Sequence, residues 1–278
     1  MNTGTYKNPI LYADYSDPDA IRVGEDYYMV ASSFTYLPGV PLLHSRDLVH
    51  WEIMNYCVPA LPFEKYDRPS HGSGTWAPSI RYHNGEFFVF VPLPDEGIFV
   101  ARSKDPKGTF QLNRLCEAKG WIDPCPFWDD DGRAYMVSAF AKSRIGFKSI
   151  LHLTQMKPDC SALLDEGKHV FDGNENNQVT IEGPKMYKRN GYYYIMCAEG
   201  GTGYNHCVTM GRSKNVWGPY EGDPKNPIVT SVPGESNERH DPDHLKPKYF
   251  NPDSVLQKSG HGSYVETSLG EVYLVHLC

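Results

Sequence analysis

One strand–turn–strand pattern recurs along this chain and restricts the fold more than any other feature. Its copies begin at residues 17, 76, 123 and 182, and a looser copy begins at residue 261. Asn-Gly or Asp-Gly pairs at 84–85, 131–132 and 190–191 favour tight hairpins, because both residues tolerate positive φ. Hairpins that recur at roughly 45 to 80 residues indicate one unit repeated around an axis. We therefore predict an all-β fold, a five-bladed β-propeller.

Acidic residues begin three of these copies. Asp17, Asp123 and Glu182 stand at the head of the first strand of their units. Equivalent positions in a propeller face the same way, and its inner strands line a common channel. The repeat therefore predicts that the three carboxylates meet at one mouth of that channel. The alternative is that Asp-Pro and Glu-Gly are ordinary turn residues before strands, but their shared place in the repeat favours a common site.

Composition argues against several classes of function. The net charge is −7, from 27 basic and 34 acidic residues, and there is no basic stripe, so we expect no nucleic-acid partner. No apolar stretch could span a membrane, and the N-terminus lacks the apolar core of a secretory signal. Seven cysteines without a Cys-x-x-Cys pair predict reduced thiols and a cytoplasmic location. Nothing in the sequence specifies an oligomeric state.

Two aromatic residues and one histidine accompany the carboxylates. Phe34 lies in a Pro/Gly-rich loop and Trp76 heads the second unit. Each either faces the channel or packs beneath a loop, and an aromatic plane at the channel suits the C–H face of a sugar ring. His261 heads the fifth unit, where a histidine can ligate an ion, orient a carboxylate or serve packing alone.

Two other polar segments invite a metal-site interpretation. The acidic run at 129–131 precedes a glycine, but it lacks the ligand spacing of a calcium loop, so a solvated turn is the preferred prediction. His240, Asp241 and His244 lie close together in a polar, proline-rich segment at 221–260. A surface loop is the preferred interpretation there, and a metal site is the alternative.

Several stretches match a known family of enzymes. They are 8–11 with 16–19, 32–34 with 38–41, 44–51, Trp76-Ala77-Pro78, Ile122-Asp123-Pro124, Glu182-Gly183-Pro184 and Gly260-His261-Gly262. With these stretches the chain resembles the five-bladed β-propeller glycosidases of glycoside hydrolase family 43, the β-xylosidases and α-L-arabinofuranosidases. The resemblance covers nearly the whole chain. One departure lies at 14–16, where Asp-Tyr-Ser replaces the familiar aromatic-His pair.

The resemblance implies a role for each carboxylate. Asp17 would be the general base that activates water, and Glu182 the general acid that protonates the leaving oxygen. Asp123 would tune the pKa of the acid and hold its orientation. Family members invert configuration at the anomeric carbon, which requires space for a water molecule. We therefore predict a separation of about 6.5–9.5 Å between the carboxyl groups of Asp17 and Glu182.

The resemblance also implies the residues around the sugar. Phe34, Trp76 and Thr202 would be substrate-binding residues. His261 would be the channel histidine, which in the family is often associated with a calcium ion or a water cluster. A structural calcium ion is therefore the metal to consider, although the chemistry itself requires no cofactor.

The predicted function is exo-acting hydrolysis of xylosides or arabinofuranosides, with short plant-derived oligosaccharides as partners. The alternatives are an endo-arabinanase-like or galactan-cleaving enzyme of the same clan and a non-catalytic carbohydrate-binding propeller. We expect residues 1–278 to form a single catalytic domain. Its last unit shows only two strands, so either the N-terminal segment completes that blade or the chain is truncated. The C-terminal β-sandwich and the arginine that many xylosidases of the family carry are absent from this sequence.

Overall fold

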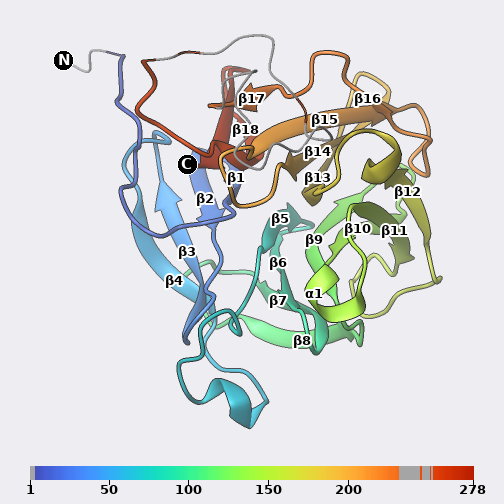
Figure 1. Ribbon diagram of the computed structural model, residues 1–278. Helices are drawn as coiled ribbons and strands as arrows, with labels where there is room; N and C mark the ends of the chain where they lie inside the picture. Colours follow the sequence, from blue (N-terminus) through green and yellow to red (C-terminus); the bar gives the residue numbers. More distant parts are fainter. Residues whose placement is uncertain (1–3, 232–244, 246–250, 252) are drawn as a thin grey trace.

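The fold is built almost entirely from strands. The computed structural model describes residues 4–231, 245, 251 and 253–278. Its strands form four sheets of four or five strands and, within these residues, one sheet of two strands. The sheets stand around a common centre (Figure 1). This arrangement confirms the predicted all-β, propeller-like fold.

The first two sheets are simple antiparallel meanders in chain order. The first contains β1 (Asp19–Val23), β2 (Asp26–Val30), β3 (Gly39–Ser45) and β4 (Glu52–Val58). The second contains β5 (Ser79–His83), β6 (Glu86–Leu93), β7 (Gly97–Ser103) and β8 (Gln111–Cys116). A short 3₁₀ turn, η1 (Glu64–Tyr66), lies in the connection between them.

The remaining sheets follow the same plan. The third contains β9 (Trp121–Trp128), β10 (Ala134–Phe140), β11 (Ile150–Met156) and β12 (Lys168–Asp172), with α1 (Lys142–Ile145) between β10 and β11. The fourth, which follows the 3₁₀ turn η2 (Gly173–Glu175), contains β13 (Glu182–Arg189), β14 (Tyr192–Glu199), β15 (Cys207–Ser213), β16 (Glu221–Gly222) and β17 (Val229–Thr230). The fifth pairs β18 (Gly260–Glu266) with β19 (Val272–Leu277).

The first strands of the sheets form a closed ring. β1 contacts β5, β5 contacts β9, β9 contacts β13, β13 contacts β18, and β18 contacts β1. Apolar clusters fill the space between neighbouring sheets; one, for example, joins Val30 and Leu42 of the first sheet to Ile80 and Val89 of the second. Because buried apolar area is the main stabilising term, each sheet depends on its two neighbours.

Tight turns connect the inner strands where the sequence predicted them. Asn84 and Gly85 have φ of 49° and 80°, and Asn190 and Gly191 have φ of 52° and 75°. Two successive positive φ values are typical of the hairpin turn whose twist matches the flanking strands. These two turns connect the inner strand of their sheet to the second strand, β5 to β6 and β13 to β14.

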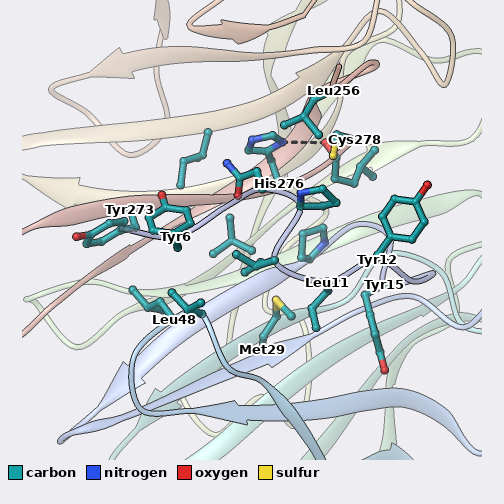
Figure 2. A pocket seen from close by; sticks show the side chains of 18 of the residues that line it. Tyr6, Leu11, Tyr12, Tyr15, Met29, Leu48, Leu256, Tyr273, His276 and Cys278 are labelled. Carbon is teal, nitrogen blue, oxygen red and sulfur yellow. Dashed lines mark hydrogen bonds between the residues drawn. The ribbon is translucent and has the colours of Figure 1, made fainter. Parts of the chain in front are cut away.

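Of the two alternatives for the last blade, completion by a strand of the N-terminal segment is not seen in the described residues. Residues 4–18 form no strand, and within the described residues β19 pairs only with β18. The segment and β19 instead line a cavity of about 1000 Å³ (Figure 2). Its wall includes Tyr6, Leu11, Met29, Leu48 and Tyr273. Pro9 has no N–H to offer a ladder, so the segment packs through side chains.

Two predictions concern a possible metal site at 240–244 and the absence of a membrane span. The candidate metal residues His240, Asp241 and His244 lie outside the described residues. No helix in the described ranges combines the length and apolar character needed to cross a membrane.

Candidate active site

A bulge interrupts three of the inner strands near their first residues. On β9, β13 and β18 the pairing register shifts at Asp123, Gly183 and His261, so that two residues stand opposite one. These residues have positive φ values of 54°, 61° and 46°, and Asp17, just before β1, has a φ of 55°. A bulge bends the strand and changes the direction of its side chain. The same local distortion therefore presents Asp17, Asp123 and His261 in their sheets.

Glu182 differs from the two aspartates in its place along the strand. Asp17, Asp123 and Gly183 each precede a proline, so Gly183 is the residue equivalent to the aspartates, and Glu182 lies one position earlier. A Cβ atom on Gly183 would lie 2.8 Å from the ring of His261. The glycine therefore leaves room for the histidine. Aligning the chain on Pro18, Pro124 and Pro184 would have revealed this offset.

Hydrogen bonds connect these residues across the sheets. Ser32 Oγ donates to Asp17 Oδ2 at 2.6 Å, and His261 Nδ1 lies 3.1 Å from Asp17 Oδ1. The N–H of Gly183 donates to Asp123 Oδ2 at 2.8 Å. Side chains from the first, third and fifth sheets thus meet beside the start of β13, where Glu182 stands.

The environment separates the pKa values of the carboxyl groups. Burial alone would raise the pKa of Asp17, but the charge and hydrogen bond of His261, together with Ser32, hold it below its usual value. Burial, followed by the charge of Asp123, raises the pKa of Glu182 to about 8. At neutral pH Asp17 is therefore ionised and Glu182 is protonated. A base and an acid with pKa values separated in this way are the pair that glycoside hydrolysis requires.

Asp123 and His261 set this difference. Burial and the charge of Asp17 raise the pKa of Asp123, although His261 opposes them. Burial lowers the pKa of His261, but the charge and hydrogen bond of Asp17, together with the charge of Asp123, outweigh it, so the net shift is upward. His261 is therefore disposed to be positively charged beside Asp17, while burial and the charge of Asp123 keep the proton on Glu182.

Comparisons with known proteins identify the family of this chain. A family model described as "Glycosyl hydrolases family 43" matches residues 6–278. The chain belongs to glycosyl hydrolase family 43. It is 36% identical over 98% of its length to "Xylosidase/arabinosidase 43B" of Humicola insolens, of which it covers 48%. It is 34% identical to the "Non-reducing end alpha-L-arabinofuranosidase BoGH43B" of Bacteroides ovatus, covering 98% of this chain and 47% of that protein.

The solved structures support the same family. The xylan β-1,4-xylosidase from Bacillus halodurans superposes with a TM-score of 0.81 at 33% identity, over 99% of this chain and 51% of that one. The family 43 chain thus spans about half the length of the curated relatives it matches.

The aromatic residues predicted for the family 43 pocket form a pair. The rings of Phe34 and Trp76 lie 5.8 Å apart, and both side chains are partly exposed. The guanidinium of Arg144 on α1 lies 5.3 Å from the Trp76 ring and donates to Asp95 at 3.0 Å. Arg144 was not predicted from the sequence, because nothing near it marks a loop that returns to Trp76.

Thr202 is exposed in the turn between β14 and β15. Ser32 is the partner of Asp17 that the sequence reasoning missed. It lies in the matched stretch 32–34, and its position directly after β2 was the available signal.

His261 is the residue that would hold the calcium ion implied by the resemblance, and its buried Nε2 has no hydrogen-bond partner among the described residues. Among the residues that the structure describes, no group of three His, Cys, Asp or Glu side chains is arranged to hold a metal ion. His261 Nδ1 is engaged by Asp17, and the fully buried ammonium of Lys185 acts on both Asp17 and Asp123. We derive no catalytic step from a metal at this site.

The contact between Gly183 and His261 can be tested directly. We expect Gly183→Ala to lower thermal stability by about 1–3 kcal/mol and to reduce turnover, because the new methyl group displaces the partner of Asp17. Gly191→Ala is the matched control, since Gly191 also has a positive φ but has no atom within 4 Å of the place that a Cβ would occupy. Equal losses in the two variants, measured by thermal unfolding and by kcat, would contradict this role for Gly183.

Proposed function

We propose that this chain carries an inverting, exo-acting glycosidase that removes terminal xylosyl or arabinofuranosyl residues from short plant-derived oligosaccharides. One observation carries the proposal. An ionised Asp17 and a protonated Glu182 coexist at neutral pH at the heads of two inner strands of the same ring, and the charge of Asp123 helps to keep the proton on Glu182. The names of the relatives from Humicola insolens and Bacteroides ovatus support the two sugars.

In this mechanism a single displacement occurs at the anomeric carbon. Asp17 accepts a proton from water, whose oxygen forms the new bond to that carbon. The bond to the leaving oxygen breaks at the same time, and Glu182 transfers its proton to that oxygen. Ser32 and His261 fix the orientation of Asp17 through their contacts with its two oxygens. A single displacement places the water and the leaving group on opposite faces, so we propose a carboxyl separation of about 6.5–9.5 Å.

The substrate-binding residues in this proposal are Phe34, Trp76, Thr202 and His261. The partly exposed rings of Phe34 and Trp76 offer an apolar plane to the sugar, which suits its C–H face. His261, at 4% exposure, would contribute mainly through Asp17. No cofactor takes part in the reaction.

Three further points belong to the same proposal. The closed ring of β1, β5, β9, β13 and β18 supports a five-bladed propeller, of which the fifth blade has two strands within the described residues. We propose that residues 1–278 act as one catalytic domain. We also propose a cytoplasmic location, supported by seven cysteines that are all free thiols.

The deciding experiment compares two substrates. Nitrophenyl xyloside and nitrophenyl arabinofuranoside are incubated with the protein, and the anomer released first is identified by NMR. Release of the inverted sugar from either substrate supports the proposal. Retained configuration or sugar binding without turnover would contradict it, and internal cleavage of an oligosaccharide would indicate an endo-acting enzyme.

The pKa values predict the pH profile of kcat/KM. Activity requires an ionised Asp17, whose pKa lies below its usual value, so the acid limb should fall below about pH 4. It also requires a protonated Glu182, so activity should decline as the pH rises through about 8. We expect a bell-shaped profile with its maximum between these limits. A profile that stays flat between about pH 7 and 9.5 would exclude Glu182 as the acid.

A further inference from the structure

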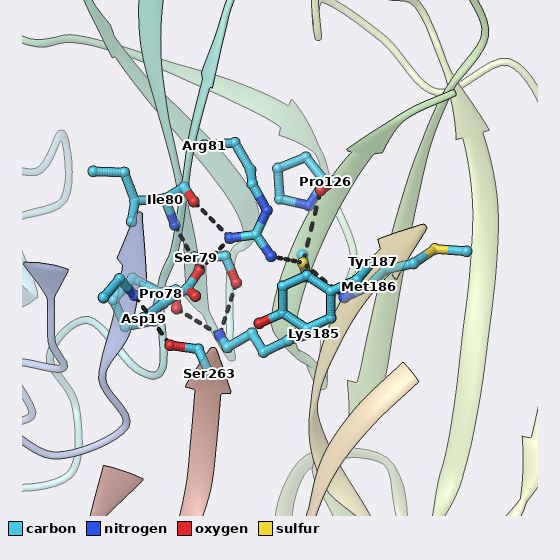
Figure 3. A network of polar contacts seen from close by, with 12 residues as sticks. Asp19, Pro78, Ser79, Ile80, Arg81, Pro126, Lys185, Met186, Tyr187 and Ser263 are labelled. Atoms are coloured by element: carbon cyan, nitrogen blue, oxygen red, sulfur yellow. Dashed lines mark hydrogen bonds and ion pairs between the residues drawn. The ribbon is translucent and has the colours of Figure 1, made fainter. Parts of the chain in front are cut away.

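A second layer of side chains lies directly behind the carboxylates. Two positions after Asp17, Ala77, Asp123, Gly183 and His261, each inner strand carries a side chain with no solvent exposure. These five residues are Asp19, Ser79, Cys125, Lys185 and Ser263. Figure 3 shows that they and their partners converge from several sheets. The layer is polar although it is buried, so each member needs a partner.

Three members follow one bonding rule. Each accepts a hydrogen bond from a backbone N–H on the next inner strand, at the residue just after that strand's own member. The bonds run from Ala20 N–H to Ser263 Oγ (3.1 Å), from Ile80 N–H to Asp19 Oδ2 (2.9 Å) and from Met186 N–H to Cys125 Sγ (3.4 Å). The layer therefore fastens neighbouring sheets to one another.

Lys185 departs from this rule because it can only donate. On β9 the expected donor would be Pro126, which has no N–H, so Ser79 is left to accept from a different partner. Lys185 Nζ donates to Ser79 Oγ at 2.8 Å and to the carbonyl of Pro78 at 2.9 Å. Lys185 thus reaches back to β5 and places a positive charge in the layer.

The backbone N–H of Tyr264 has a different partner because residue 185 is a lysine. By the rule, the N–H of Tyr264 on β18 would bond to residue 185, but an ammonium group cannot accept. The N–H donates instead to the hydroxyl of Tyr187, at 3.2 Å. The surrounding hydrogen bonds are therefore arranged for a lysine at this position.

The charge of Lys185 is not neutralised within its own layer. Asp19 is the acidic member, but its Oδ2 is paired with Arg81 at 2.7 Å. Within the described ranges no carboxylate lies within ion-pair distance of Lys185 Nζ. Its charge instead favours the ionised forms of Asp17 and Asp123. A buried ammonium that is bound only to neutral oxygens requires such compensation.

We propose that the Lys185 ammonium is the built-in cation of this channel, and that it balances the charges of Asp17 and Asp123 from the layer behind them. The assignment of catalysis to those carboxylates rests on the proposed function, whereas the charge balance does not. A calcium ion beside Lys185 and the raised-pKa His261 would be repelled. Lys185 is a positioning residue, because it is fully buried behind the site.

Stability measured against pH tests the charge balance without any assay of activity. Lys185→Met keeps the length of the side chain and removes the charge. The pKa of Asp123 is raised and that of Asp17 is lowered, so as the pH falls Asp123 takes up its proton first while Asp17 stays ionised. We therefore expect a loss in Tm of about 5 °C or more at about pH 7.5, and a smaller loss at about pH 4.5, where only the attraction to Asp17 remains. The other titratable or charged groups facing this cluster are Asp19, Arg81, Glu182, His206 and His261. A loss that is equal at both pH values would indicate packing alone and overturn the proposal.

Lys188→Met is the matched control. It makes the same change three residues further along β13, where the partly exposed Lys188 pairs with the nearly buried Asp129 and the exposed Asp130. Removing this pair should lower the Tm, but the pKa of Asp129 lies below its usual value, so this carboxylate is ionised at both pH values and the loss should be the same at each. If Lys188→Met reproduced the pH-dependent loss of Lys185→Met, the effect would not belong to the channel.

Calcium titration tests the replacement of a metal. We expect the Tm and calorimetric signal of the wild-type protein to be unchanged by calcium chloride or by a chelator. Calcium binding that is lost in Asp123→Asn would overturn the proposal, because the ion would then occupy the channel. If glycosidase activity is present, Lys185→Met should lower kcat at least tenfold with little change in KM. If no glycoside is hydrolysed at all, the proposed function fails, and the stability and calcium measurements still decide the role of Lys185.

Discussion

Glu182→Gln is expected to lower kcat/KM for xylo- or arabino-oligosaccharides by about 10²–10⁴-fold, the usual contribution of a positioned general acid. The amide has nearly the shape of the protonated carboxyl group, so the site should remain assembled. It has no acidic proton to give to the leaving oxygen. The decline of activity as the pH rises through about 8 should disappear as well, because that limb reports the ionisation of Glu182.

The leaving group provides the internal control for this variant. The dinitrophenolate ion leaves a dinitrophenyl glycoside without protonation by an acid. The rate of hydrolysis of this substrate should therefore fall far less than that of an oligosaccharide. Glu175→Gln makes the same change in the exposed 3₁₀ turn η2 and should leave both rates unchanged. Equal losses on both substrates in Glu182→Gln would assign Glu182 to binding rather than to proton transfer.

Asp17→Asn is expected to reduce kcat by about 10²–10⁴-fold with every leaving group, because the water then has no base. Added azide, which attacks without losing a proton, should restore part of the rate and give a glycosyl azide of inverted configuration. The variant also removes the charge that raises the pKa of His261, so that histidine should titrate at lower pH by NMR.

Asp14→Asn serves as the control for Asp17→Asn, since Asp14 is exposed in the same N-terminal segment. Its turnover should match that of the wild-type protein. Normal turnover in Asp17→Asn, or an azide product of retained configuration, would remove Asp17 from the role of base. Folding of each variant is checked by circular dichroism before the rates are compared.

Most of the fold could be predicted from the repeat, because the residues that favour a hairpin turn are adjacent in the sequence. Asn84-Gly85 and Asn190-Gly191 form the turns that their residue types favour, and the strands on either side follow from alternation and β propensity. The N-terminal segment was harder to predict. Whether this segment completes the last blade depends on contacts with β19, which lies at the opposite end of the sequence.

The site was predictable to the extent that it repeats. Asp17 and Asp123 share one place before a proline, and His261 occupies the same bulge. Glu182 was grouped with them although it stands one residue earlier, because the need for Gly183 becomes visible only when the ring of His261 is seen against it. The importance of Lys185 was equally hidden, since its partners Pro78 and Ser79 lie 107 and 106 residues away.

The contact between β1 and β18 has a consequence for biosynthesis. It joins segments 243 residues apart, for example through the hydrogen bond from Ala20 to Ser263. Closing such a long loop is slow compared with forming a local hairpin. On the ribosome, the earlier sheets can form one after another as they emerge, while Asp17 must wait for His261 to be translated. A nascent chain should therefore acquire its hydrolytic centre abruptly, late in synthesis.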